Sequence, residues 1–465
     1  MPHTASLFAS AAPELRIDPA ALDPPAELLH ARRERFLAQL GEGVAILSAA
    51  PELLKSRDTG VRYRQDSDLF YLTGFPEPGA VALFTPHDPE HRFTLFVRPR
   101  DPDQEVWHGT RAGPEGARER YAADASYPIE ELSSHLRKLV EPGDRIFYAL
   151  GADAQMDRRV VELVVHFRRA RQRAGRGPTA VADPGVILDG MRLIKEPVEL
   201  ERLRLAARLS AEGHRVAMQL ARPGIGEWEL EAALEAVFRA GGGAGSAYPS
   251  IVASGPGATV LHYVANNRRA REGELVLIDA GAEVGMYAGD ISRTFPVSGR
   301  FTPAQRRLYE IVLAAENAAI AEVRPGAAVT AAHDAAVRTM VEGMLEVGLL
   351  QGDPDKLIEE EKHKRYFMHN SSHWLGLDVH DVGLYKRAGE PVPLEPGMVL
   401  TIEPGLYIPE SDTDAPEEFR GIGIRIEDNV VVTDSGCELL TRDIPVEVEE
   451  IEALVGSLAD DGRHA

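Results

Sequence analysis

The chain has 465 residues, enough for two domains or for one large domain with additions. Its formal charge of −22 argues against the clustered basic face that nucleic-acid binding requires. No apolar stretch approaches the ~20 residues that span a bilayer, and the single cysteine, Cys437, excludes an intrachain disulfide and a thiolate metal cluster. Residues 1–21 lack the basic start and apolar run of a secretory signal, so we expect a cytoplasmic protein with no nucleic-acid or membrane partner.

The first part of the chain alternates between two kinds of pattern. A helix is expected over 24–40, where an amphipathic run ends before Gly41. Short apolar runs rich in β-branched and aromatic residues predict strands, and amphipathic runs between them predict helices. The expected strands are 43–50, 69–75, 79–86, 92–99 and 144–151, and the expected helices are 114–123 and 128–141. This alternation predicts an α/β domain with a mixed sheet.

A Gly- and Pro-rich stretch at 175–185 predicts a loop, and we place the domain boundary there, giving domains 1–185 and 186–465. A long helix is expected to begin at Pro197 and to end before Pro223. The remaining expected elements are a helix at 227–242, strands at 275–283 and 291–297, a helix pair at 303–349, and strands at 398–408 and 421–433.

Two carboxylates stand where expected strands meet near the middle of the chain. Asp279 closes an apolar run that predicts a buried strand, and burying an ionised carboxylate without a partner is very costly. Asp290 lies eleven positions later and opens a second β-prone segment, so a hairpin would bring the two side chains together. A capping or turn role is the plainer alternative, and it fits Asp290 better than Asp279.

The same pattern recurs towards the C-terminus. Glu403 terminates the apolar run 398–402, and strand alternation places Glu427 on one face with Arg425, with a simple ion pair as the alternative. Four carboxylates that converge at a buried place repel one another unless cations neutralise them. Oxygen donors with one imidazole favour hard divalent ions, manganese first, with cobalt or zinc able to substitute, and such a set suits two ions roughly 3.5–4 Å apart.

Residues 369–383, "HNSSHWLGLDVHDVG", concentrate three of the chain's 15 histidines within twelve positions. Each of His369, His373 and His380 alone would be interpreted as a core histidine with satisfied hydrogen bonds. Together with the carboxylates, they predict one metal ligand and two side chains available for catalysis. The segment does not match the helical zinc-protease motif, because no Glu follows the first histidine.

These segments resemble a known family. "LIDAGAEVGMYAGDISRTFPV", "HNSSHWLGLDVHDVG", "EPGMVLTIEPGLYI" and "FRGIGIRIED" resemble the pita-bread metallopeptidases, and among them the Xaa-Pro aminopeptidases (aminopeptidases P). "DSDLFYLTGFPEP" and "EVWHG" resemble the N-terminal creatinase-type domain of that family, so the resemblance covers nearly the whole chain. It implies an α/β (α+β) protein in which a creatinase-type mixed α/β domain precedes a pita-bread domain with a curved antiparallel sheet flanked by helices.

The resemblance also implies roles for individual residues. Two divalent metal ions per subunit are expected, with Asp290 and Glu427 bridging them; the implied ligands are Asp279, Asp290, His373, Glu403 and Glu427. His262 and His380 match catalytic histidines, and His369 matches one that shapes a proline pocket. The other implied substrate-binding positions are Arg425, a supporting residue near the ligands, and Trp107, which in oligomeric members reaches a neighbouring active site. The family's usual Gly after the first histidine is Asn370 here, a residue type that tolerates positive φ.

The implied activity is hydrolysis of the N-terminal Xaa-Pro bond of peptides with proline at the second position, releasing the first residue. Water activated by the metals would attack the carbonyl carbon, Glu403 would move the proton, and His262 and His380 would stabilise the oxyanion. A homodimer or homotetramer is expected. The alternatives are an Xaa-Pro dipeptidase, then a methionine aminopeptidase or a metal-independent creatinase-type hydrolase, and, from another class, a binding protein of the same fold without catalysis.

Overall fold

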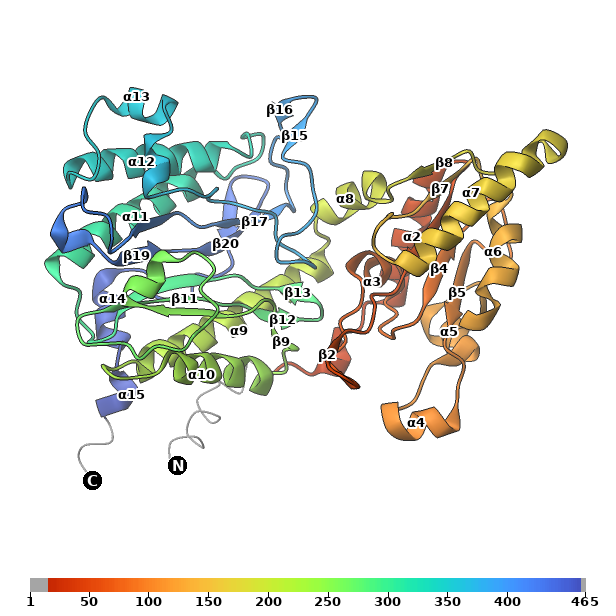
Figure 1. Ribbon diagram of the computed structural model, residues 1–465, viewed down its shortest axis with the longest axis horizontal. Helices are drawn as coiled ribbons and strands as arrows, with labels where there is room; N and C mark the ends of the chain where they lie inside the picture. The colour runs from red at the N-terminus through yellow and green to blue at the C-terminus, as the bar shows by residue number, and fades with distance from the viewer. Residues whose placement is uncertain (1–15, 461–465) are drawn as a thin grey trace. The chain divides into compact units, whose positions relative to one another are not determined.

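The computed structural model describes residues 16–460, and the chain divides into two compact units (Figure 1). One unit is formed by residues 23–191, and the other by the described residues up to 22 together with those from 192 onward. Residues 1–15, part of the stretch examined above for a secretory signal, lie outside the described residues. Between residues 16 and 460, no helix combines the length and the apolar character needed to cross a membrane.

The unit formed by residues 23–191 is built on a six-stranded mixed sheet in the order β6-β5-β4-β1-β7-β8. β4 pairs antiparallel with β1 and β5, whereas β6, β7 and β8 join by parallel pairing. Its strands are β1 (Val44–Ser48), β4 (Val81–Phe84), β5 (Phe93–Val97), β6 (Ala125–Pro128), β7 (Arg145–Phe147) and β8 (Ala180–Ala182), with a small hairpin of β2 (Leu54–Ser56) and β3 (Thr59–Gly60). Its helices are α2 (Ala26–Leu40), α3 (Ser67–Thr73), α4 (Pro102–His108), α5 (Gly113–Tyr121), α6 (Leu132–Val140), α7 (Ala154–Ala174) and α8 (Gly185–Leu193), the last of which runs past residue 191. The mixed sheet expected from the sequence is confirmed.

The expected strand at 69–75 is wrong, because this segment forms the helix α3. The side chain of Asp66 caps its N-terminus by accepting a hydrogen bond from the Leu69 amide at 2.8 Å. Gly74 ends it in the left-handed conformation with φ of 64°, and its amide bonds back to the Phe70 carbonyl. A short apolar run fits a buried helix and a strand equally well, and here the caps decide in favour of the helix.

The second unit contains several small antiparallel sheets that lie between two pairs of helices (Figure 1). Helices α9 (Pro197–Leu220) and α10 (Glu227–Ala240) cover one side, and α11 (Pro303–Glu322) and α12 (Ala331–Glu346) the other. The strands are β9 (Gly245–Ser246), β10 (Ile251–Ser254), β11 (Leu275–Asp279), β12 (Ala282–Val284), β13 (Tyr287–Ala288), β14 (Ser292–Pro296), β15 (Lys386–Arg387), β16 (Glu390–Pro391), β17 (Val399–Ile402), β18 (Gly405–Ile408), β19 (Ile422–Arg425), β20 (Asp428–Val432) and β21 (Cys437–Leu439). Shorter helices are α13 (Pro354–Glu359), α14 (Val448–Leu454) and α15 (Ser457–Asp460). This is the expected arrangement of antiparallel strands flanked by helices.

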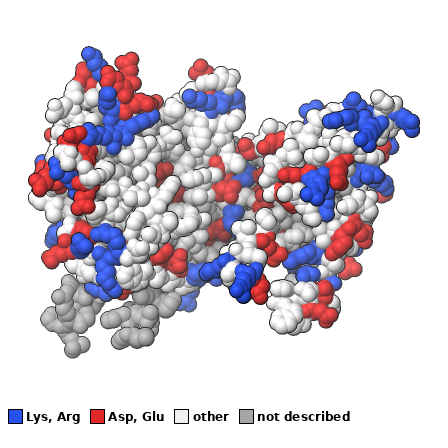
Figure 2. Space-filling view, in the orientation of Figure 1, with Lys and Arg blue, Asp and Glu red and all other residues white. Residues whose placement is uncertain are grey.

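Strand pairing in this unit brings distant parts of the sequence together. β11 pairs antiparallel with β14, so that Asp279 lies opposite Ser292. A single β-bridge then joins Ser292 to Glu427, which follows β19. Residues separated by well over a hundred positions therefore meet at one place between the helix pairs. On the face drawn in Figure 2, acidic and basic side chains are intermixed over the surface.

Candidate metal centre

Five acidic and imidazole side chains come from five places in the second unit. Asp279 is the last residue of β11, and Asp290 lies two residues before β14. Glu403 occupies the connection between β17 and β18, and Glu427 the connection between β19 and β20. His373 belongs to an irregular segment whose Trp374 bridges to β17. Strand ends supply most of these positions, because there a side chain can leave the hydrophobic layer without breaking a β-ladder.

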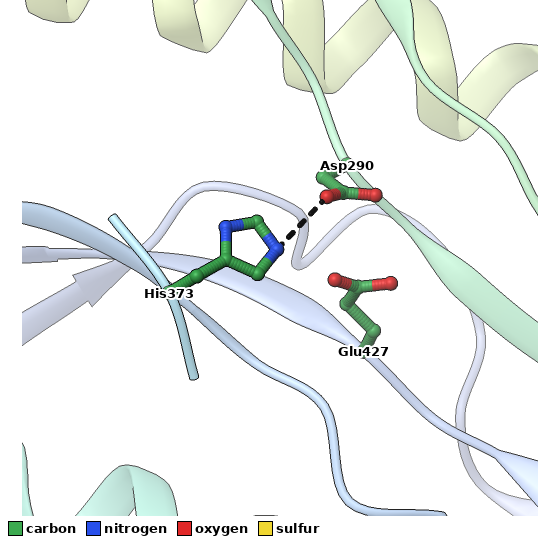
Figure 3. A group of neighbouring side chains, drawn as sticks. All are labelled: Asp290, His373 and Glu427. Carbon is green, nitrogen blue, oxygen red and sulfur yellow. Dashed lines mark ion pairs between the residues drawn. The ribbon is translucent and has the colours of Figure 1, made fainter. Parts of the chain in front are cut away.

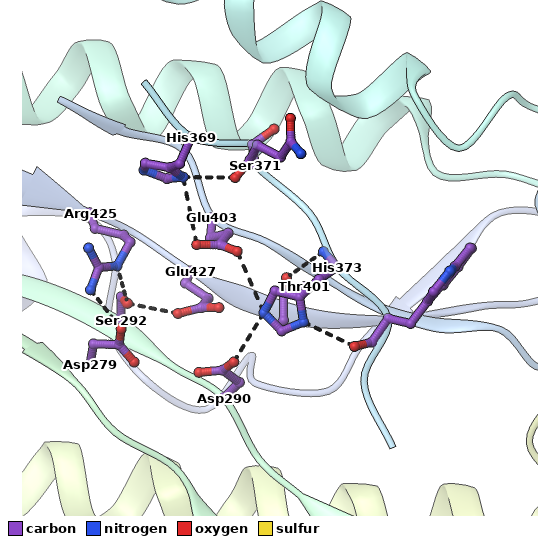
Figure 4. Close-up of polar contacts among 12 residues, drawn as sticks. Asp279, Asp290, Ser292, His369, Ser371, His373, Thr401, Glu403, Arg425 and Glu427 are labelled. Carbon is purple, nitrogen blue, oxygen red and sulfur yellow. Dashed lines mark hydrogen bonds and ion pairs between the residues drawn. The ribbon is translucent and has the colours of Figure 1, made fainter. Parts of the chain in front are cut away.

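Asp290, His373 and Glu427 form the centre of the cluster, with one possible ligand atom from each lying within 4.8 Å of the others (Figure 3). His373 Nε2 lies 3.3 Å from Asp290 Oδ2 and 3.5 Å from Glu403 Oε1 (Figure 4). Its other ring nitrogen, Nδ1, lies 3.0 Å from the Trp374 carbonyl oxygen. A proton on Nδ1 is donated to that carbonyl, which leaves Nε2 directed at the carboxylates, as in many metal-binding histidines.

Asp279 is fixed from two sides. Arg425 Nη2 donates to Asp279 Oδ2 at 2.6 Å (Figure 4). The Tyr248 hydroxyl lies 2.7 Å from Asp279 Oδ1. The same hydroxyl also lies within hydrogen-bond distance of Asp290, so its one proton is shared between the two aspartates expected to act together. Both aspartates keep a second oxygen or lone pair available, because each carboxylate oxygen can accept more than one contact.

A second set of polar contacts supports Glu427 and His369. Ser292 Oγ donates to Glu427 Oε2 at 2.7 Å and accepts from Arg425 Nε at 2.9 Å. Arg425 Nη1 also donates to the Tyr407 hydroxyl at 2.9 Å, which lies 2.9 Å from His369 Nε2. The guanidinium thus links the carboxylate cluster to the histidine that the resemblance places in the proline pocket.

Burial and mutual repulsion make the carboxylates reluctant to ionise. Burial raises the pKa of Glu403 to about 7, and burial together with the neighbouring carboxylates raises the pKa values of Asp290 and Glu427, that of Glu427 well above its usual range. Burial alone would lower the pKa of His373, but the ion pair with Asp290 raises it to about 9. Protons therefore balance the charge of the metal-free cluster. A buried set of four carboxylates and one imidazole fits divalent cations, which would replace those protons.

The cluster lies in the wall of a cavity of about 460 Å³. All five expected ligands line it, and so do the other expected site residues of this unit, His262, His369, His380 and Arg425. Trp107 does not line this cavity: it is 79% exposed on α4, in the unit formed by residues 23–191. The structure thus brings together every expected site residue except Trp107.

Two of the other histidines that line the cavity, His369 and His380, are poor bases. Burial lowers the pKa of His369 to about 4. Burial and then the charge of His373 lower the pKa of His380, whose ring centroid lies 4.5 Å from that of His373. Neutral imidazoles can donate a hydrogen bond without adding positive charge beside the cations. Asn370 does not adopt a positive φ, so this position does not require the glycine common in the family.

Three polar residues of the site escaped the sequence analysis. Tyr248 lies in the Gly-rich stretch 240–250, for which the sequence predicts no site residue, and Ser292 lies in the expected strand 291–297 without an expected role. Tyr407 stands in a quoted motif but received no role. The side of the sheet that Tyr407 faces depends on how β18 pairs with β19, where Tyr407 lies opposite Gly423. A single sequence does not reveal this strand register.

Comparisons with known proteins agree with this geometry. A family model described as metallopeptidase family M24 matches residues 201–434, and one described as aminopeptidase P, N-terminal domain, matches residues 29–148. The Xaa-Pro aminopeptidase of Escherichia coli is 42% identical over 426 residues, covering 91% of this chain and 96% of its own length. The structure of aminopeptidase PepP from Pseudomonas aeruginosa matches with a TM-score of 0.91 and 46% identity, covering 94% of this chain and 99% of its own. Zn-substituted E. coli aminopeptidase P in complex with product matches with a TM-score of 0.89 and 41% identity, covering 94% and 99%.

The fold and the buried donor cluster define a metal-dependent peptidase. The chain belongs to metallopeptidase family M24. Within that family, the relatives from Escherichia coli and Haemophilus influenzae that match over nearly their whole length are Xaa-Pro aminopeptidases, and the N-terminal part of the chain matches the N-terminal domain of aminopeptidase P. The resemblance found in the sequence, the fold class and the assignment to a peptidase are confirmed.

We expect metal-free and metal-loaded protein to respond oppositely to pH. The folded pKa of His373, about 9, exceeds its unfolded value of 6.5, so its stabilising proton is fully effective below pH 6.5 and is lost as pH rises to 9. That loss is on the order of 3 kcal/mol. Glu403, with a folded pKa of about 7, acts in the same direction between pH 4.5 and 7. Metal competes with these protons, so the rise in Tm on adding Mn²⁺ should grow with pH.

Thermal unfolding with a chelator and with excess Mn²⁺, measured at pH 6, 7.5 and 9, tests this expectation. A Mn²⁺-induced shift in Tm that is constant or smaller at pH 9 would contradict it.

Proposed function

We propose that the chain hydrolyses the N-terminal Xaa-Pro bond of peptides and that it uses two divalent ions, with Mn²⁺ preferred and Co²⁺ or Zn²⁺ able to substitute. The observation that carries this proposal is the convergence of five donors in one cavity; the proposed metal ligands are Asp279, Asp290, His373, Glu403 and Glu427. The names of the relatives support the reaction, and E. coli aminopeptidase P has been solved with substrate and with the inhibitor Pro-Leu.

Divalent ions in the cluster would supply Lewis acidity towards the scissile carbonyl and lower the pKa of a nearby water. Glu403 is the residue best suited to carry a proton from that water to the leaving proline nitrogen. Its carboxylate lies beside the cavity and 3.5 Å from His373 Nε2.

His262 and His380 are proposed to stabilise the substrate oxygen as it becomes negative. Both line the cavity, and burial favours the neutral form of His380 by lowering its pKa. A hydrogen-bond donor placed where charge develops strengthens in the transition state more than in the ground state. The acidic cluster would also attract the free amino group of the substrate and so favour N-terminal cleavage.

The proline ring is proposed to lie near His369, whose orientation Tyr407 and Arg425 fix. Because burial lowers the pKa of His369 to about 4, its ring is neutral at pH 7 and compatible with an apolar ring beside it. Proline offers this slot a fixed φ, so binding orders one torsion fewer than for other residues.

Two further parts of the proposal concern the setting of the enzyme. We propose that it acts in the cytoplasm as a homodimer or homotetramer. The exposed Trp107, 79% accessible on α4, supports a role in the site of a neighbouring subunit. Sedimentation of wild type and Trp107→Ala protein, with activity measured on the same samples, tests this role.

Incubation of Mn²⁺-loaded protein with a set of peptides tests the activity itself. We expect release of the first residue from peptides such as Gly-Pro-Leu-Gly, no release when Ala replaces Pro, and slower cleavage of the dipeptide Gly-Pro. Preferred cleavage of Gly-Pro would instead identify an Xaa-Pro dipeptidase. No cleavage of any member, with two equivalents of metal bound, would support a binding protein of this fold.

A further inference from the structure

The segment that carries His262 is held in an unusual way. Between β10 and β11, residues 255–268 of the described chain form one 3-10 turn, Gly255–Thr259, and no strand. Val260 and Val264 are each 54% exposed, and few apolar side chains hold the segment: Ala258 is buried, and Leu261 and Tyr263 pack against the same small cluster. The buried Asn266 adds hydrogen bonds to the Val252 amide and the Ser250 carbonyl. Yet Leu261, His262 and Val264 all line the proposed active-site cavity.

One buried carboxyl group fastens this segment at three points. Glu227, the first residue of α10, is 1% exposed. Its Oε1 accepts from the Ser254 amide at 2.8 Å and from the Ser254 hydroxyl at 2.7 Å. Its Oε2 accepts from the Tyr263 hydroxyl at 3.0 Å and from the Arg268 amide at 2.7 Å. The contacts lie at the start of the segment, beside His262, and at its end.

The same contacts tie the segment to the strands of the metal cluster. Ser254 is the last residue of β10, which pairs antiparallel with β11 so that Ile251 lies opposite Asp279. Arg268 strengthens the connection, because its Nη1 bonds to the Ser254 carbonyl and its Nη2 lies 3.1 Å from Glu274 Oε1. These contacts therefore fix the segment that carries His262 relative to β11, the strand that carries Asp279.

We propose that Glu227 is a positioning residue for His262 in the reaction proposed above, on which this inference rests. It contacts neither metal ligand nor cavity and acts through Tyr263, the neighbour of His262. A carboxylate suits the task because two oxygens accept four hydrogen bonds, and bonds to a charged acceptor are about twice as strong as neutral ones. Catalytic groups displaced by about 1 Å can lose ~10²-fold in rate, so the anchor controls turnover.

Glu227→Gln tests the proposal with the smallest change in shape. One oxygen of Glu227 accepts a hydrogen bond from the Ser254 amide and the other from the Arg268 amide. Whichever oxygen becomes the NH2 group of glutamine, that group would face a backbone N–H donor and one hydrogen bond would be lost. We expect kcat on an Xaa-Pro peptide to fall about tenfold or more, with metal content at the wild-type level and KM changed less than about threefold. Tyr263→Phe removes the contact to Glu227 beside His262, together with a longer one to Asn267 Oδ1 at 3.4 Å, and is expected to give a smaller loss of the same kind.

The control is Glu229→Ala, which removes another carboxylate from the same helical turn. Glu229 accepts from the Gly226 amide at 2.7 Å and from the exposed Arg269 Nη1 at 3.2 Å. Its loss removes a helix cap and an exposed ion pair but none of the contacts at Ser254, Tyr263 or Arg268. We expect a lower Tm with kcat within about twofold of wild type. If Glu229→Ala lowers kcat as much as Glu227→Gln at equal Tm, general destabilisation explains the effect and the proposal is wrong.

A double-mutant cycle with His262→Ala separates positioning from stability. If Glu227 acts through His262, Glu227→Gln in the His262→Ala background should lower kcat less than twofold further. A full additional loss overturns the proposal. Failure of the proposed function is distinguished from failure of this inference, because it would abolish cleavage in wild type.

Hydrogen exchange provides a test that needs no activity. We expect residues 255–268 to exchange faster in Glu227→Gln but not in Glu229→Ala, and unchanged exchange in Glu227→Gln would contradict the anchoring role.

Discussion

Replacing Glu427 by glutamine should stabilise the metal-free protein and at the same time abolish catalysis. In the metal-free chain, burial and the charges of Asp290 and Glu403 raise the pKa of Glu427 well above its usual range. Near neutral pH the carboxyl is ionised in the unfolded chain but must be protonated to be buried, and this lowers the free energy of unfolding. Glutamine has no proton to take up and avoids this cost. Ser292 Oγ, which donates to Glu427 Oε2 at 2.7 Å, finds an equivalent acceptor in the amide oxygen.

The sign of the stability effect follows from proton linkage. A carboxyl with a raised folded pKa destabilises the protein increasingly as pH rises above its unfolded value of about 4.5. At pH 7 the relief in Glu427→Gln is on the order of 3 kcal/mol, and at pH 5 it nearly vanishes. With chelator present, we expect a Tm several degrees above wild type at pH 7 and an equal Tm at pH 5.

With Mn²⁺ present, Glu427→Gln should instead be less stable than wild type. An amide oxygen is a weaker ligand and carries no charge to balance the cations, so Mn²⁺ should no longer raise the Tm of Glu427→Gln. We expect kcat/KM to fall by about 10³-fold or more, equivalent to about 4 kcal/mol of transition-state stabilisation. Glu418→Gln, at a half-exposed position paired with Arg307, is the matched control and should change neither quantity. A Glu427→Gln protein that is less stable without metal, or that retains two equivalents of Mn²⁺, would contradict this account of the cluster.

How far the sequence predicts the structure depends on how local the deciding contacts are. Long amphipathic runs identified α9, α11 and α12, and a Pro in the first turn located the start of α9 at residue 197. The segment 69–75 was wrongly expected to be a strand because its helix depends on caps at Asp66 and Gly74 that a β-turn reading also accommodates. α7, over Ala154–Ala174, was not anticipated, although Asp153 provides a capping residue and Gly175 a C-terminal stop.

In the candidate site, too, local sequence pattern predicts some residues but not the long-range contacts that bring them together. Carboxylates such as Asp279 and Glu403 could be singled out because each ends an apolar strand, a costly place for a charge. Their meeting place could not be derived from local pattern, because it depends on the β-bridge between Ser292 and Glu427, which joins residues 135 positions apart. The resemblance to a family supplied that long-range information. Tyr248 was missed because its role depends on a hydrogen bond between its hydroxyl and Asp279, and no local pattern in a Gly-rich stretch predicts that contact.

Replacing His380 or His262 by alanine should lower turnover steeply while the metal cluster stays intact. Both side chains line the cavity, but the group of possible ligand atoms within 4.8 Å of one another is formed by Asp290, His373 and Glu427. If each imidazole stabilises the oxyanion, its loss should reduce kcat by about 10²–10³-fold, the range measured for single oxyanion-hole donors.

The pH dependence of metal binding gives a second test of the His380 variant. His380 lies against His373, with ring centroids 4.5 Å apart and a pKa lowered by burial and by the charge of that neighbour. Because that pKa is lowered, His380 is uncharged in the pH range where His373 loses its proton, so its removal should leave the pH dependence of metal binding unchanged. Metal analysis, kcat and the pH profile of Mn²⁺ affinity, with the exposed His30→Ala as control, check these expectations. Loss of metal together with activity in both variants would show that these histidines maintain the cluster rather than stabilise the oxyanion.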